Sequence, residues 1–553
     1  MGQGTSSRQA NVTGDSRQVK TKYGSVVGRR FGFGEKEVDA FQGIPFAKPP
    51  VGDLRFKKPI PPVAWEGVRE TKKFAARGIQ KDMSLVEKIK LGPTSEDNLY
   101  LNVFTPTWSP STASGFATLV FIHGGGFVCD STVKYGDVGI CEHLCTKDVV
   151  VVTLQYRIGL LGFFSTGDQH CLGNFGLWDQ TEALKWVKEN IAYFNGDPDN
   201  ITVMGQSAGG ASVDLLSICP HSRDLFHKVI PMAGNAGCSF ATHDDMVEES
   251  RKFAESHGVE FTLDSAKMIE SLRGLAADKF ALSLFESLSK SPGSTRCPCG
   301  PRIDGDFIPK SVSELRREAP PKPMLIGCCE SEGLIFTATA KPPSTSLIME
   351  IIATLFSEAE YPIIFKKLRE QLFQKMISNP KDHMEVKRAY VEIFGKEFTN
   401  GAQQTVVETL EANDVPVFFY SFDYCNPKSW GPLSLRWPFK EATHCTEIAY
   451  IFAVGIIWSF EFNDDDKRML ELTTRMWANF AKYGDPNGIG ADPATSPAPL
   501  CPEAFTWEPT TLSNPQRHLS ISLQPQMKDI YKKGVPLFVV ETNRERDRLS
   551  KKL

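Results

Sequence analysis

A serine lies between glycines in the segment GQSAG at 205–209. This is the G-x-S-x-G pattern, in which a tight turn after a strand lifts a serine hydroxyl out of a sheet. The apolar run 201–204 before it predicts a buried strand, and residues 211–216 after it predict a helix. The pattern therefore predicts that Ser207 is a nucleophile, with the Ala208 amide directed at a developing oxyanion. A chance match is the alternative, because a chain of this length contains about 0.2 such patterns at background composition.

A second glycine-rich segment, HGGGF at 123–127, follows the apolar run 118–122. Successive glycines after a buried strand leave backbone N–H groups free to converge on an anion. The segment therefore predicts the other half of an oxyanion hole, and a flexible glycine loop is the alternative.

A serine hydroxyl needs a base to accept its proton and a carboxylate to orient that base. In this arrangement the chain order is serine, acid, histidine. Among the later histidines, His444 lies in a loop ahead of the apolar segment 448–452. Glu330 and Glu332 both follow the strand-like run 323–326. The residues alone do not choose between these two acids.

Elements that alternate between strand and helix would position these groups. Apolar runs at 118–122 and 149–154 predict buried strands, and 177–194 has the periodicity of a helix. This alternation predicts an α/β fold with a mostly parallel central sheet and helices on both faces. The helix-rich region 340–440 is expected to be an insertion that covers the site. No linker divides the chain, so we expect a single domain over 21–540.

Composition excludes several classes of protein. Hydrophobic residues make up 41% and charged residues 23%, which is ordinary for a soluble globular protein. The net charge of −4 indicates no nucleic-acid partner. The apolar stretch 450–458 is too short to span a bilayer. Cys297-x-Cys299 and the pair at 328–329 lack zinc-site spacing, so no metal or cofactor is expected.

The two ends of the chain are predicted to be tails. Residues 1–20 are polar and expected to be disordered, and 541–553 form a charged tail. The first segment has no apolar core, so it is not a secretory signal. It fits M-G-x-x-x-[ST], which predicts N-myristoylation at Gly2, with a plain polar tail as the alternative. We therefore expect a cytoplasmic protein with peripheral membrane contact through that lipid.

The sequence resembles the type-B carboxylesterase and cholinesterase-like family of α/β-hydrolases from about residue 21 to about residue 535. Together the matching segments are highly specific. They are FQGIPFAKPPVGDLRF (41–56), EDNLYLN (96–102), HGGGF (123–127), YRIGLLGF (156–163), GNFGLWDQTEALKWVKENI (173–191), GDP (196–198), GQSAGG (205–210) and GPRIDGDFIP (300–309).

The resemblance implies a role for individual residues. Ser207 corresponds to the family's nucleophile and His444 to its general base. The family's acid directly precedes a glycine, which selects Glu332 over Glu330. The implied oxyanion donors are the amides of Gly125, Gly126 and Ala208. The implied substrate-pocket residues are Gln206, Phe127, Phe240 and Phe336.

The sequence departs from the family at its disulfides. The positions that correspond to the four paired cysteines are Gly78, Asn98, Val259 and Ser271. The chain has 13 cysteines, an odd number, and disulfides belong to oxidising compartments. We therefore expect it to fold without disulfides in a reducing compartment. An ion pair between Arg55 and Glu96 is implied as a structural feature of the family.

The sequence also departs from the family around the predicted site. Gln206 replaces the glutamate that is common before the serine, and Phe240 corresponds to an acyl-pocket tryptophan. No tryptophan lies between 78 and 98, so the aromatic platform that binds choline is missing. Uncharged esters should therefore be preferred over choline esters. Ala233 replaces a serine that supports the acid–base pair in the family.

The expected function is that of a serine carboxylesterase, which forms an acyl-enzyme on a Ser-His-Glu triad and takes a small-molecule ester as substrate. Acyl transfer to an alcohol by the same triad is one alternative. A non-catalytic cholinesterase-like adhesion module is another. The sequence indicates neither the physiological ester nor the oligomeric state.

Overall fold

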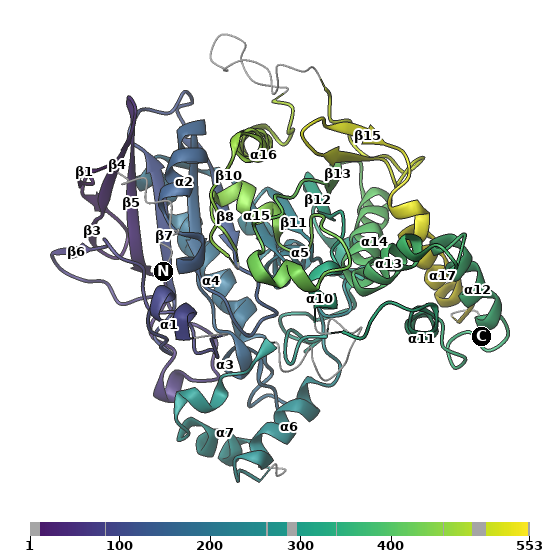
Figure 1. Ribbon diagram of the computed structural model, residues 1–553. Helices are drawn as coiled ribbons and strands as arrows, with labels where there is room; N and C mark the ends of the chain where they lie inside the picture. Colours follow the sequence, from purple (N-terminus) through teal and green to yellow (C-terminus); the bar gives the residue numbers. More distant parts are fainter. Residues whose placement is uncertain are drawn as a thin grey trace.

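A large sheet with helices packed around it forms the centre of the protein (Figure 1). The structure is a computed structural model that describes residues 11–82, 85–260, 264–284, 296–338, 340–456, 458–488 and 505–550. The predicted myristoylation site, Gly2, lies outside these residues.

Twelve strands of the described residues make up the sheet. The fifth to the eleventh strand in the spatial order given below run parallel to one another, and the strands toward both edges pair antiparallel. This confirms the predicted α/β class with a mostly parallel sheet. The spatial order is β1 (Asn11–Asp15), β4 (Arg29–Phe33), β5 (Lys36–Pro45), β7 (Tyr100–Pro106), β9 (Val149–Leu154), β8 (Phe116–Ile122), β10 (Gly196–Gln206), β11 (Lys228–Met232), β12 (Met324–Cys329), β13 (Val417–Phe422), β14 (His518–Ile521) and β15 (Gln526–Lys528). A small second sheet contains β2 (Val19–Lys20), β3 (Ser25–Val27) and β6 (Val68–Glu70).

Helices pack on both faces of the sheet. Successive strand residues point to opposite faces, and Val203 and Met204 of β10 accordingly belong to two different hydrophobic clusters. The cluster of Val203 includes residues of α4 and α5, and that of Met204 includes residues of α15 and α16. The α-helices are α1 (Leu85–Leu91), α2 (Val138–His143), α3 (Gly159–Phe163), α4 (Phe175–Asn190), α5 (Ala208–Ile218), α6 (Met246–Ser256), α7 (Ser265–Arg273), α9 (Val312–Glu318), α10 (Leu334–Thr337), α11 (Thr345–Leu355), α12 (Phe365–Met376), α13 (His383–Phe394), α14 (Lys396–Ala412), α15 (Thr446–Phe452), α16 (Asp464–Tyr483) and α17 (Val535–Ser550).

The predicted helical insertion over 340–440 is shorter than expected. Helices α11 to α14 occupy its first part. Helices α11 to α13 form a hydrophobic cluster of their own together with neighbouring segments, whereas buried residues of α14 belong to the cluster of Val203. Residues 417–422 instead form β13, which lies inside the central sheet. Their side chains are all buried, as the aromatic sequence VFFYSF allows on a strand covered on both faces.

The predicted tails are also shorter than expected. The prediction of disorder over 1–20 is wrong for 11–20, because β1 pairs with β4 and Val19 of β2 is buried. The charged segment at the other end continues α17 as far as Ser550. Strand pairing with distant residues holds the first of these segments, and its polar sequence carries no sign of that pairing.

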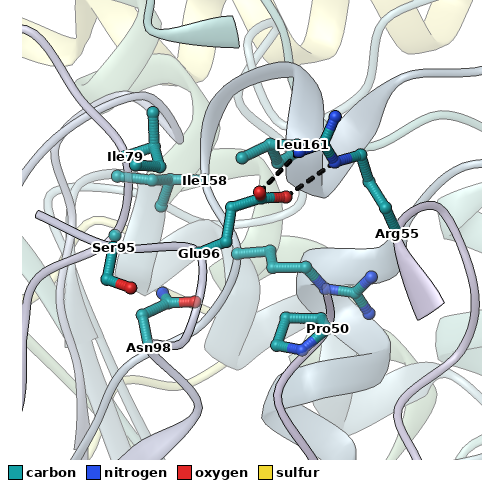
Figure 2. Close-up of a pocket in the computed structure, with 10 residues that line it drawn as sticks. Pro50, Arg55, Ile79, Ser95, Glu96, Asn98, Ile158 and Leu161 are labelled. Carbon is teal, nitrogen blue, oxygen red and sulfur yellow. Dashed lines mark hydrogen bonds and ion pairs between the residues drawn. The ribbon is translucent and has the colours of Figure 1, made fainter. Parts of the chain in front are cut away.

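Polar contacts hold the region where the family has its first disulfide. A Cβ placed on Gly78 would lie 3.0 Å from Nδ2 of Asn98, so these two positions adjoin. The Asn98 amide donates to the buried carbonyl of Tyr156 at 3.1 Å. Beside it, Arg55 donates to both carboxylate oxygens of Glu96 at 2.7 and 2.5 Å (Figure 2). Every cysteine within the described ranges is a free thiol.

Because no cross-link holds the described fold, we expect the same melting temperature with and without a strong thiol reductant. Loss of a native disulfide would cost about 2–5 kcal/mol and lower the melting temperature by several degrees. Titration of free thiols under denaturing conditions should approach 13 per chain. A clear drop in melting temperature on reduction would contradict this expectation.

Candidate active site

Ser207 occupies a strained turn between β10 and α5. Its backbone has φ 60° and ψ −126°, in a region that residues other than glycine rarely adopt. Its N–H donates to the carbonyl of Met232 on β11 at 2.9 Å, and its own carbonyl accepts from Ala211 at 2.9 Å. Both main-chain groups are therefore satisfied although the conformation is unusual.

Glycines let the strand and the helix cross closely at this turn. A Cβ on Gly205 would lie 2.4 Å from the carbonyl oxygen of Gly209. A Cβ on Gly209 would lie 2.2 Å from the carbonyl oxygen of Ile122, at the end of β8. Real side chains do not approach backbone atoms so closely, so the G-x-S-x-G spacing is a steric requirement of this crossing.

The three residues predicted to form a triad are brought together. Nε2 of His444 lies 2.9 Å from Oγ of Ser207, and Nδ1 lies 2.6 Å from Oε2 of Glu332. Oε1 of Glu332 accepts from the backbone N–H of Cys329 at 2.5 Å. His444 and Glu332 are 7% and 2% exposed. This arrangement matches the hydrogen-bonded chain of nucleophile, base and acid that acyl transfer requires.

Glu330, the alternative acid, has different neighbours. Its N–H donates to the carbonyl of Phe422, and its own carbonyl accepts from the Lys532 side chain at 2.5 Å. Burial, with Asp423 and Glu441 nearby, raises the pKa of Glu330 to about 7. Of the two acids that the residues left open, the structure places Glu332 on His444.

The surroundings of His444 favour its charged form. Burial lowers the pKa of the imidazole, but the Cys445 thiol and the Glu332 carboxylate outweigh burial and raise that pKa well above its ordinary value. A further acid, Glu447, is fully buried nearby and accepts from the Cys329 thiol at 2.7 Å. Burial and the neighbouring Glu332 raise the pKa of Glu447 to about 7.

The glycine loop after β8 lies against the nucleophile turn. Ile122 pairs with Gly205 in the sheet, and a Cβ on Gly124 would lie 2.5 Å from the carbonyl oxygen of Gln206. Gly125 and Gly126 have φ of 84° and 59°, and no backbone hydrogen bond in the described ranges uses their N–H groups. Ala208 is the first residue of α5, where a helix leaves its N–H groups without an intrahelical partner. These three predicted donors therefore remain available to an anion.

The neutral side-chain amide of Gln206 faces the predicted base, His444. Nε2 of Gln206 lies 3.4 Å from Nε2 of His444, and its Oε1 accepts from the Cys445 thiol at 3.2 Å. Cys445 has φ 74°, which turns the chain sharply after His444. The sequence interpretation missed Cys445, although its position next to the predicted base was the available signal.

Three aromatic rings form a wall beside His444. The rings of Phe336 and Phe398 lie 5.7 and 4.3 Å from the imidazole, and Phe240 lies 5.4 Å from Phe398. Phe398 belongs to α14, and no local pattern marked it. Phe127 is fully buried and packs edge-on against Phe163 at 5.2 Å.

Ala233 cannot support the acid through a side-chain hydroxyl. It has φ 43°, and its N–H donates to the carbonyl of Gly327 at 2.8 Å. Other groups support the acid: the Thr443 hydroxyl donates to the carbonyl of Glu332 at 3.1 Å, and the Cys329 N–H donates to its carboxylate. The loop that carries the acid is thus fixed without the family's serine.

Comparisons with known proteins relate the chain to esterases. Residues 15–538 match the model of the carboxylesterase family. The chain is 37% identical to esterase cest-33 of Caenorhabditis elegans over 96% of its length and 95% of that protein. It is 33% identical to the human cocaine esterase over 88% of its length and 86% of that protein. It is 32% identical to the medium-chain fatty acyl-CoA hydrolase precursor of Anas platyrhynchos over 86% of its length and 85% of that protein.

Replacing Glu332 with Gln should remove the charge that favours the protonated imidazole. Because Glu332 contributes to the raised pKa of His444, we expect the pH below which kcat/KM falls to shift to a lower value. Activity should also fall by about 10³–10⁴-fold, as when the orienting acid of other triads becomes an amide.

A pH–rate profile of Glu332→Gln and of the wild type tests this expectation. Glu330→Gln is the matched control, since Glu330 has no hydrogen bond to His444 in the described structure, and it should leave the profile unchanged. Equal profiles for the wild type and Glu332→Gln would contradict the assignment of the acid.

Proposed function

This chain belongs to the carboxylesterase family and is a carboxylic ester hydrolase, and we propose that it acts through an acyl-enzyme on Ser207. The observation that carries the proposal is the pair of hydrogen bonds, 2.9 and 2.6 Å long, that join Ser207 to His444 and His444 to Glu332. In this geometry one imidazole can accept the serine proton and keep its other nitrogen on a carboxylate.

In the proposed reaction, Oγ of Ser207 attacks the ester carbonyl carbon while Nε2 of His444 accepts its proton. The carbonyl oxygen becomes an oxyanion, which the N–H groups of Gly125, Gly126 and Ala208 stabilise. His444 then donates the proton to the departing alkoxide oxygen, and the C–O bond of the ester breaks. Water attacks the acyl-enzyme by the same path and releases the acid.

The proposed substrates are uncharged esters with an apolar acyl or aryl group. Phe336, Phe398 and Phe240 give the site an apolar wall next to the base. Gln206 adds no negative charge, so a cationic alcohol gains no ion pair at this position. The wall supports burial of an apolar group, worth about 25 cal/mol per Å² removed from water.

We propose further that the protein resides in a reducing, cytoplasmic compartment and carries a myristoyl chain on Gly2. The free thiols in the described ranges and the N-terminal motif support this proposal. A single such chain gives only marginal, reversible membrane affinity. None of the described helices is both long and apolar enough to cross a bilayer. An N-terminal mass without the acyl increment, measured on protein from a eukaryotic host, would refute the lipid.

The Ser207→Ala variant should fold but lose both ester hydrolysis and covalent labelling by a fluorophosphonate. Only a serine activated by a base reacts with this reagent at an appreciable rate. Ser212→Ala, in the helix that follows, is the matched control and should keep labelling. Labelling that persists in Ser207→Ala would show that another residue is the nucleophile.

Replacing Gln206 with Glu should favour cationic esters. A carboxylate at this position would attract a bound ammonium by about 1 kcal/mol, so kcat/KM for acetylcholine should rise about fivefold relative to its uncharged isostere, 3,3-dimethylbutyl acetate. The wild type should prefer the isostere. Kinetics with both esters measure the ratio, and a wild type that prefers acetylcholine would contradict the proposed substrate class.

A further inference from the structure

A cavity of about 420 Å³ lies outside the proposed catalytic site. Residues 56–58, the loop 169–173 and helix α7 contribute most of its lining. Its volume falls in the range of pockets that bind small organic molecules. None of its lining residues belongs to the triad, the oxyanion loop or the aromatic wall. Figure 1 shows α7 at the edge of the molecule, away from α5 and α15.

Apolar side chains line one part of this cavity. Phe56, Phe175 and Ile269 line it and are only 2%, 5% and 2% exposed. The Phe56 ring is fixed by contacts with Phe164 and Phe280, with ring centroids 5.4 and 5.6 Å apart. The apolar area that these side chains present to the cavity is small, and packing fixes it before any ligand binds.

The charged residues of the lining are mostly positive. Lys57, Lys58 and Arg273 line the cavity with one carboxylate, Asp306, and Lys58 already pairs with that carboxylate at 2.7 Å. Within the described ranges, neither Lys57 nor Arg273 has a carboxylate partner. The whole chain carries a net charge of −4, so the charge of this cavity is opposite in sign to the net charge of the protein.

The guanidinium of Arg273 is held in place. Its Nε donates to the carbonyl of Arg55 at 3.0 Å, and Nη1 of Arg55 donates back to the carbonyl of Arg273 at 3.2 Å. Arg55 is in turn fixed by Glu96 (Figure 2). The terminal nitrogens of Arg273 have no acceptor among the described residues. A guanidinium fixed in this way matches the two oxygens of a carboxylate.

We propose that this cavity binds an amphipathic carboxylate, with its apolar or aromatic body against Phe56, Phe175 and Ile269 and its carboxylate on Arg273 and Lys57. The ligand needs an apolar part because part of the lining is apolar. It needs a negative charge because Arg273 and Lys57 are cations. Carboxylic acids are also what ester hydrolysis releases, so the acid product of the enzyme belongs to this class of ligand.

Calorimetric titration of the full-length protein with 2-naphthoate tests the proposal. Arg273→Gln and Lys57→Gln should each weaken binding at least tenfold. Lys267→Gln is the matched control: Lys267 lies on the same helix, is 82% exposed and pairs with Asp264, and its loss should not change the affinity. Binding should also weaken with rising salt. Melting temperatures and turnover of a neutral ester, equal in all variants, show that each protein is folded.

Control measurements distinguish binding in this cavity from other modes of binding. Binding of 2-naphthoate in the catalytic site would be insensitive to Arg273→Gln, so an unchanged affinity in that variant overturns the proposal. Equal binding of uncharged 2-naphthamide would show a site that recognises only apolar surface. Equal binding of inorganic phosphate would show a site for a bare anion. Either result, or the absence of 2-naphthoate binding to the wild type, also overturns it.

Discussion

The close crossing of β10 and α5 is the constraint on which the rest of the site depends. It holds Ser207 at φ 60°, a conformation that costs on the order of 1–3 kcal/mol. The cost is sustained because the backbone of Ser207 is hydrogen-bonded on both sides and the flanking glycines leave no room for relaxation. The hydroxyl is therefore aimed before any ester binds, and no free energy is needed to orient it during the reaction.

The parallel sheet extends this constraint to the other groups. Strands β8, β10 and β12 run in the same direction, so the glycine loop, Ser207 and Glu332 all emerge at the carboxyl edge of the sheet, where α/β proteins place their ligand sites. His444 is different, since it arrives from a loop outside the sheet. Glu332 fixes one edge of its ring and Phe398 covers a face, so the base depends on both the sheet and the helical insertion.

The sequence was sufficient to predict those parts of the site whose backbone geometry depends on the local residues. The Ser207 turn and the glycine loop are examples, because only glycine tolerates the contacts found there. The choice between Glu330 and Glu332 could not be derived from the residues, since it depends on which side chain leaves the strand end toward His444. Phe398 was missed for a related reason: its role comes from the packing of α14 against a segment about 46 residues away in sequence.

The buried acid Glu447 shows how electrostatics adds to this framework. Its pKa is about 7 in the folded chain, above the ordinary 4.5, so ionising Glu447 opposes folding, and the stability present below pH 4.5 is progressively lost as the pH rises toward 7. A leucine of similar size would avoid that cost. The acid lies close to His444 and shares Cys329 with Glu332. A negative charge there favours the imidazolium that forms as the serine proton is transferred, so the site retains a group that weakens the fold and strengthens the base.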